Sequence, residues 1–309
     1  MNQVAPSTPP PRFYSRTRII AIFGIGAVTM LIGSIADLSV STALYEPDAG
    51  WANLLAAIGE WPAGFGLIVA GVFLVRGRNK TRVLRGRAQA GAGGLLVLLG
   101  AAMVSYLPTM YLSIPAVVII LAGMVLSAGA VLGTWALTRH RAPRVLIRFS
   151  VGLIVVIIGE MIIINLIKIG WSRPRMRMLE VHSEYSFNPW WIFGSADKAD
   201  ALGQGISSEE FKSFPSGHTA NAAILLYLAP MLAWMTERGR KLIGPAVYIG
   251  LGWALAVAAS RIVVGAHFLT DVTAGLIVTF LAVLVTHRVV RAPWKAPVAE
   301  QPSVEMSDA

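Results

Sequence analysis

Two histidines stand among residues that could carry out nucleophilic or acid–base chemistry. His267 is followed four residues later by Asp271, and residues at this spacing share one face of a helix. The carboxylate can accept a hydrogen bond from one imidazole nitrogen and leave the other nitrogen with a free lone pair. A neutral histidine oriented in this way is suited to act as a nucleophile or a base.

The second histidine, His218, ends the sequence Pro-Ser-Gly-His and directly precedes a long apolar run. Pro215 suits the start of a helix, and the free N–H groups of a helix N-terminus favour a bound anion. Gly217, next to Ser216, lets the backbone approach a ligand closely. A histidine at this position could give a proton to a leaving group.

Three cations accompany the histidines: Lys168 and Arg175 in the sequence KIGWSRPRM, and Arg261 six residues before His267. Two imidazoles, three cations and a helix N-terminus describe a site for phosphoryl transfer. Such a site must stabilise the negative charge on three equatorial oxygens in the transition state.

Arg173 competes with Arg175 for the role of the first arginine. Lys168 and Arg175 are seven residues apart and share a helix face, whereas Lys168 and Arg173 do not. This favours Arg175. However, Pro174 can disturb the helical phase, so both arginines remain candidates.

The elements that must position these residues are membrane helices. Of the 309 residues, 55% are hydrophobic and 14% are charged, and the mean hydropathy is +0.65. This composition is typical of a multi-span membrane protein. The absence of cysteine excludes disulfides and Cys-ligated zinc. At about 20 residues per span, eight runs qualify: 19–40, 53–75, 91–112, 114–138, 149–168, 218–236, 242–262 and 268–287.

Arginine and lysine gather in alternate connections between the predicted spans. The positive-inside rule then places both termini and these connections in the cytoplasm, and residues 169–217 and the three motifs at the outer face. The net charge of +10 is explained by these connections and anionic lipid, so nucleic acid is not an expected partner. The basic connections are 76–87, 139–148, 238–241 and 288–295.

Acidic residues also lie in or near the predicted spans, at Asp37, Glu60 and Glu160. An acid inside a membrane indicates function by default. Glu160 lies eight residues, about 12 Å along a helix, before Lys168, which is too deep to contact the phosphate, so we expect it in a hydrogen bond inside the bundle. The remaining histidines and the outer aromatic residues are expected at the membrane interface without a catalytic role: His140, His182, His287, Trp190, Trp191 and Phe193.

The pattern Lys-x6-Arg, Pro-Ser-Gly-His and Ser-Arg-x5-His-x3-Asp resembles the type 2 phosphatidic-acid phosphatase superfamily, in particular its membrane lipid-phosphate phosphatases, over about residues 149–288. Met176 departs from the family pattern, which usually has proline after the first arginine. The resemblance implies that His267 attacks phosphorus and forms a phosphohistidine, that Asp271 orients it, and that His218 protonates the leaving oxygen. It further implies a reaction without metal or other cofactor, with the phosphate held by Lys168, Arg175, Ser216, Gly217 and Arg261.

We therefore expect an all-α polytopic helix bundle of about eight transmembrane helices with a six-helix phosphatase-type core. Residues 1–18 and 289–309 are expected to be disordered cytoplasmic termini, 19–138 to form four helices, and 149–288 to form the catalytic core. The expected protein is an outward-facing plasma-membrane phosphatase acting on undecaprenyl diphosphate, phosphatidic acid, phosphatidylglycerol phosphate or a similar lipid. Its partners would be that substrate and membrane lipids, and its oligomeric state stays open. A transporter and a catalytically silent membrane protein are the alternatives.

Overall fold

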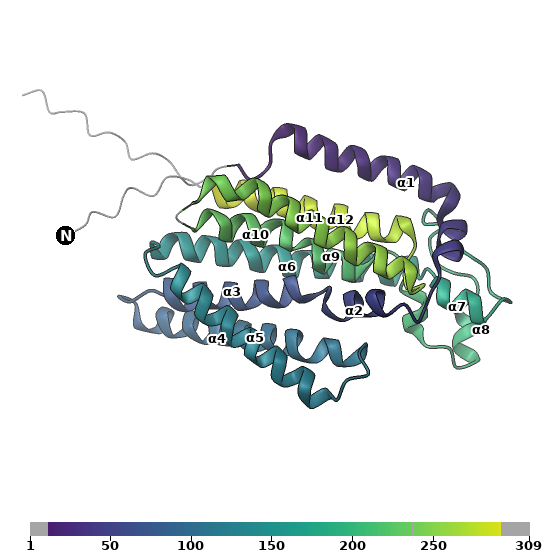
Figure 1. Ribbon diagram of the computed structural model, residues 1–309, viewed down its shortest axis with the longest axis horizontal. Coiled ribbons are helices and arrows are strands. Elements are labelled where there is room, and N and C mark those ends of the chain that lie inside the picture. Colours follow the sequence, from purple (N-terminus) through teal and green to yellow (C-terminus); the bar gives the residue numbers. More distant parts are fainter. Residues whose placement is uncertain (1–11, 237, 292–309) are drawn as a thin grey trace, which may run out of the picture.

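Long apolar runs form helices in a membrane because lipid offers no hydrogen-bond partner to an open backbone. The computed structural model describes residues 12–236 and 238–291, in which every regular element is a helix (Figure 1). The long helices are α1 (Arg16–Leu44), α3 (Trp61–Gly77), α4 (Val83–Tyr106), α5 (Ala116–Leu137), α6 (Pro143–Trp171), α11 (Arg240–Val263) and α12 (Leu269–Arg291). The short ones are α2 (Gly50–Ile58), η1 (Leu107–Met110), α7 (Met176–Val181), α8 (Lys198–Gly203), η2 (Ser208–Phe211), α9 (Gly217–Ala223) and α10 (Leu225–Trp234).

Seven helical stretches of the described residues are long and apolar enough to cross a membrane. The predicted all-α polytopic bundle is confirmed, and the chain is a multi-pass membrane protein. The count differs from the predicted eight because the run at 218–236 is divided into α9 and α10, each too short to qualify alone. The run at 53–75 is also interrupted, between α2 and α3, although the two pieces together qualify as one span.

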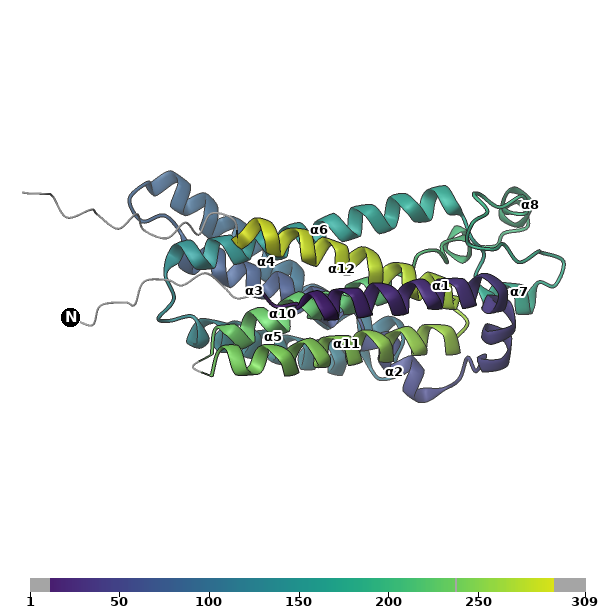
Figure 2. The same ribbon diagram turned by 90° about the horizontal axis from the view of Figure 1, so that it is seen from above.

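The first helices of the chain do not form a layer of their own. Helix α1 packs along α12 and also contacts α11, and α3 packs against α6, α4 and α5 (Figures 1 and 2). Helix α3 is buried along most of its length, so it occupies the middle of the bundle. It contacts α6, α9 and α10, while α4 and α5 lie to one side against it (Figure 1).

Small residues let α3 and α4 approach until their backbones touch. A Cβ added to Gly71 would lie 2.4 Å from the carbonyl oxygen of Gly93, and one added to Gly100 would lie 2.4 Å from that of Gly64. In lipid, helices associate mainly by van der Waals packing, which favours glycine at such contacts. The seven-residue spacing of each glycine pair keeps both contacts on one side of its helix.

The neighbouring residues Gly93 and Gly94 test this contact. A Cβ at Gly93 would lie 2.6 Å from the carbonyl oxygen of Gly71, whereas a Cβ at Gly94 meets no atom of the described residues within 4 Å. We expect Gly93→Ala to cost about 1–3 kcal/mol of stability through overpacking, and Gly94→Ala to leave stability unchanged or slightly increased. Thermal unfolding in detergent measures both variants, and equal effects would contradict close packing of α3 on α4.

Both ends of the described chain are more ordered than predicted. Helix α1 begins at Arg16, capped by the Ser15 side chain, and the preceding Phe13 and Tyr14 are buried. Phe13 stacks on the ring of His287 with centroids 4.1 Å apart, so His287 is a buried packing residue and not the interface residue expected. The prediction of disorder is wrong for residues 12–18 and for 289–291, which belong to α12, while residues 1–11 and 292–309 lie outside the described residues.

The segment between α6 and α9 folds over one end of the bundle. Helices α7, α8 and η2 lie there (Figures 1 and 2) and enclose a small apolar cluster that includes Met178 and Phe211. Trp190, predicted as a membrane-interface residue, donates from its indole Nε1 to Ser34 Oγ of α1 at 2.9 Å, whereas Trp191 and Phe193 are exposed. The segment between α6 and α9 is thereby attached to the first helix of the chain.

Candidate active site

The structure brings the three motifs together at the end of the bundle that this segment covers. Lys168 lies in the last turn of α6, and its Nζ is 3.6 Å from the position that a Cβ of Gly217 would take. The backbone N–H of Ser216 donates to the carbonyl of Asp271 at 2.9 Å. His267, Lys168, Arg175 and Arg261 all lie close enough to act electrostatically on His218. The eight site residues predicted from the sequence therefore lie around a single site.

His267 is held as a neutral imidazole with one free lone pair. Its Nδ1 lies 2.6 Å from the carbonyl oxygen of Ser213. Because a carbonyl can only accept, Nδ1 carries the proton and Nε2 the lone pair. The side chain is 1% exposed, and this burial, only partly offset by Asp271, lowers the pKa of His267 to about 3. The imidazole is thus uncharged at neutral pH, as a nucleophile requires.

Asp271 supports His267 by a less direct route than the sequence predicts. The carboxylate lies 3.8 Å from His267 Nδ1, which is too far for a hydrogen bond. It accepts from Ser213 Oγ at 2.5 Å and from the backbone N–H of Phe268 at 2.7 Å. The helix-face argument does not apply because α12 begins only at Leu269, after His267. Asp271 therefore fixes Ser213, whose carbonyl holds the imidazole.

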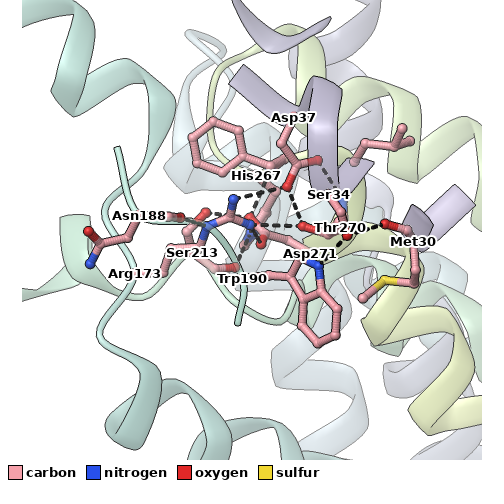
Figure 3. Close-up of polar contacts among 12 residues, drawn as sticks. Met30, Ser34, Asp37, Arg173, Asn188, Trp190, Ser213, His267, Thr270 and Asp271 are labelled. Carbon is pink, nitrogen blue, oxygen red and sulfur yellow. Dashed lines mark hydrogen bonds and ion pairs between the residues drawn. The ribbon is translucent and has the colours of Figure 1, made fainter. Parts of the chain in front are cut away.

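Arg173 is a structural cation at the back of the site, and it is 1% exposed (Figure 3). Its Nη2 donates to Asp37 of α1 at 2.9 Å, and its Nη1 donates to Asp271 at 2.5 Å and to Thr270 at 2.9 Å. The third nitrogen, Nε, donates to the carbonyl of Asn188 at 2.7 Å. Every nitrogen of the guanidinium is engaged within the protein, so Arg173 is poorly placed to bind a phosphate.

Arg175 and Arg261, in contrast, have N–H groups that lack partners. The Nε of Arg175 and the Nε and Nη1 of Arg261 are buried, and no acceptor in the described part of the chain lies within hydrogen-bond distance of them. Buried donors are normally paired, and leaving them unpaired is costly. An anion with several oxygens would satisfy all three. The geometry favours Arg175 over Arg173 as the first arginine, while its contact with a phosphate stays a prediction.

Ser216 begins helix α9 and is fully buried. Its Oγ accepts from the backbone N–H of Thr219 at 3.3 Å and from the Thr219 hydroxyl at 3.1 Å. These two bonds use the lone pairs of the oxygen and leave its own proton to donate. The phosphate contact predicted for Ser216 would use that proton.

The site also contains residues that the sequence did not assign to it. Glu60, between α2 and α3, has an Oε1 3.2 Å from Nδ1 of His218, and the hydroxyl of Tyr111 lies 3.0 Å from its Nε2. The sequence marked Glu60 and Asp37 as acids in or near apolar runs, but it did not indicate which residues they contact. No sequence motif pointed to Tyr111 or Ser213, because only the folded chain brings them close to the histidines.

Metal ions have no evident binding cluster here. Within residues 12–236 and 238–291, no group of three or more His, Asp or Glu side chains is arranged to hold one. Glu160, expected in a hydrogen bond inside the bundle, is 1% exposed in α6. The described side chains offer a neutral imidazole at His267, a second imidazole at His218 and unpaired guanidinium donors on Arg175 and Arg261.

Comparison with known proteins identifies the superfamily of the segment that carries these residues. Residues 149–295 match the family model of the PAP2 superfamily, and all eight predicted site residues lie in that range. No curated protein and no solved structure matches the chain. The resemblance drawn from the three motifs, to the type 2 phosphatidic-acid phosphatases, is confirmed at the level of the superfamily. The C-terminal part of this multi-pass membrane protein, residues 149–295, belongs to the PAP2 superfamily.

Proposed function

We propose that the protein is a membrane phosphatase that hydrolyses a lipid phosphate or diphosphate at the outer face through a phosphohistidine. Membership of the superfamily supports a phosphatase-type activity on phosphate esters. The observation that carries the proposal is the set of three buried guanidinium N–H donors on Arg175 and Arg261 beside the neutral His267. A tetrahedral phosphate supplies the acceptors that these donors lack.

The reaction proceeds in two steps. In the first, the Nε2 lone pair of His267 forms a bond to phosphorus, the bond from phosphorus to the leaving oxygen breaks, and His218 gives that oxygen a proton. In the second, a water molecule attacks the phosphohistidine, His218 takes a proton from the water, and phosphate leaves as His267 regains its lone pair. Arg175, Arg261 and Lys168 stabilise the charge on the phosphate oxygens in both steps.

A lipid substrate fits the position of the site. The predicted phosphate-binding residues lie at the ends of membrane helices, at the depth where a headgroup would lie. The surface of α6 around Lys168 exposes large apolar side chains, including Ile162, Leu166 and Ile169, which suit contact with acyl or prenyl chains. Undecaprenyl diphosphate ranks first among the candidate substrates and phosphatidic acid second, because the superfamily includes enzymes that recycle the polyprenyl carrier.

The direct test is phosphate release by the purified protein from a panel of lipid phosphates and diphosphates, with and without excess EDTA. We expect release from at least one lipid of the panel and an unchanged rate in EDTA, because Lys168, Arg175 and Arg261 supply the positive charge that a metal ion would otherwise provide. Loss of activity in EDTA with recovery on adding Mg²⁺ would contradict the metal-independent mechanism. Release from no lipid phosphate would contradict the function.

Sidedness is a separate prediction. The loops at the opposite end of the bundle are basic, and Arg78, Lys80, Arg85 and Arg144 line one cavity of about 610 Å³ there. The positive-inside rule puts that end in the cytoplasm and the site outside. When the protein is produced in a bacterial host, intact spheroplasts should hydrolyse an added short-chain lipid phosphate. Activity that appears only after lysis would place the site in the cytoplasm and would remove the basis for the ranking of substrates.

A further inference from the structure

The acid His218 is contacted on both ring nitrogens by residues that precede the superfamily segment. Glu60 Oε1 lies 3.2 Å from Nδ1, and the hydroxyl of Tyr111 lies 3.0 Å from Nε2. The side chains of Glu60 and His218 are only 17% and 16% exposed, so water screens their interaction weakly. The rings of Tyr111 and His218 meet edge to face. The two contacts together define the plane of the imidazole.

The position of Glu60 is fixed by the interruption between α2 and α3. Trp61 donates from its indole Nε1 to the carbonyl of Val104 at 3.1 Å, which ties the start of α3 to α4. On the other side, Gly59 accepts from the indole Nε1 of Trp253 at 3.4 Å, and a Cβ at Gly59 would lie 2.9 Å from a methyl carbon of Val257. The break between α2 and α3 therefore lies between α4 and α11, and its position places Glu60 next to His218.

A protonated His218 needs a counter-charge in this site. The positive charges of Lys168, Arg175 and Arg261 act on it, together with His267, and they oppose an imidazolium. The Glu60 carboxylate, 3.2 Å from Nδ1, forms an ion pair with a protonated His218 and offsets that repulsion. Nε2 faces the Tyr111 hydroxyl at 3.0 Å, and a leaving-group oxygen would take the place of that hydroxyl to receive the Nε2 proton.

We propose that Glu60 is a positioning residue for His218, and that the N-terminal half of the chain thereby completes the active site. The inference rests on the proposed phosphatase function. Glu60 supplies the counter-charge for the protonated imidazole, so that the Nε2 proton passes to the leaving oxygen as its bond to phosphorus breaks. Glu60 also lies close enough to Arg261 and Lys168 to act on them electrostatically, so the dependence on the leaving group, and not the rate on one substrate, tests its action through His218.

The dependence on the leaving group tests this role. The full-length protein, its Glu60→Gln variant and a Glu160→Gln control are assayed on phosphatidic acid and on 4-nitrophenyl phosphate. The alcohol released from phosphatidic acid needs a proton, whereas 4-nitrophenolate leaves without one. Glu60→Gln should lower kcat on phosphatidic acid about a hundredfold, the usual size of an acid–base contribution, and change kcat on 4-nitrophenyl phosphate little. Glu160→Gln, which removes another buried acid, should change the ratio of the two rates little.

A double variant separates positioning from a general structural effect. In a His218→Ala background, Glu60→Gln should cause no further loss, because residues that act as a unit are not additive. An equal loss on both substrates, or an additive loss in the double variant, would overturn the proposal, as would an unchanged Glu60→Gln variant. Failure of the wild-type protein to release phosphate from 4-nitrophenyl phosphate and from every lipid of the panel would instead contradict the proposed function, and it is seen before any variant is compared.

Discussion

Replacing His267 by alanine is expected to abolish phosphate release while the protein still folds. The imidazole is the nucleophile of the proposed mechanism, and loss of a covalent nucleophile costs about 10⁴-fold or more in rate. Its one hydrogen bond in the described structure goes to the Ser213 carbonyl, so the substitution should cost only about 1–3 kcal/mol of stability. Acid quenching of the wild-type enzyme with a radiolabelled substrate should trap a phosphoenzyme that the variant does not form.

His182 offers a control at the same end of the bundle. It pairs with Glu184 at 3.3 Å, and its side chain is 36% exposed, far more open than His267. His182→Ala should retain both the rate of release and the trapped label. A phosphoenzyme that persists in His267→Ala would assign the nucleophile to another residue and would overturn the two-step mechanism.

The second large effect separates two arginines that are two residues apart. Arg173→Ala should lower the free energy of unfolding by about 3–5 kcal/mol, because it leaves the carboxylates of Asp37 and Asp271 buried without their cation. Arg175→Ala should leave stability nearly unchanged and lower kcat/KM by about 10²–10³-fold, as expected for a donor to the transition state. Arg173 is 1% exposed, so its replacement removes a buried cation and not a solvated one.

Activity alone does not distinguish the two variants, since Arg173 also holds Asp271 and through it the Ser213 carbonyl that orients His267. Thermal unfolding in detergent, with and without added vanadate as a phosphate mimic, does distinguish them. Vanadate should stabilise the wild-type protein by mass action but not Arg175→Ala. If Arg173→Ala instead kept wild-type stability and lost the effect of vanadate, Arg173 would be the phosphate-binding arginine and Arg175 would not.

Much of the fold follows from composition and local pattern. Apolar runs of about 20 residues become helices wherever they lie in a membrane, because the bilayer forces backbone groups to bond internally. The helix breaks at Glu60 and between α9 and α10 could not be predicted from hydropathy. A short break in a helix hardly changes the mean hydropathy of the whole span. The membership of the superfamily followed from three short motifs, whose residue types and spacing are specific even without coordinates.

The sequence by itself determined which residue types stand at the ends of the helices that form the site. Only the tertiary structure decided which of them meet. Arg173 and Arg175 could not be separated by helical phase because α6 ends at Trp171 and Ser172 adopts a left-handed conformation with φ of 46°. Asp37 and Glu60 reach the site from more than a hundred residues away. Local periodicity describes one face of one helix, whereas these contacts depend on how separate helices pack, and that is set by the close approach of α1 to α12 and of α3 to its neighbours.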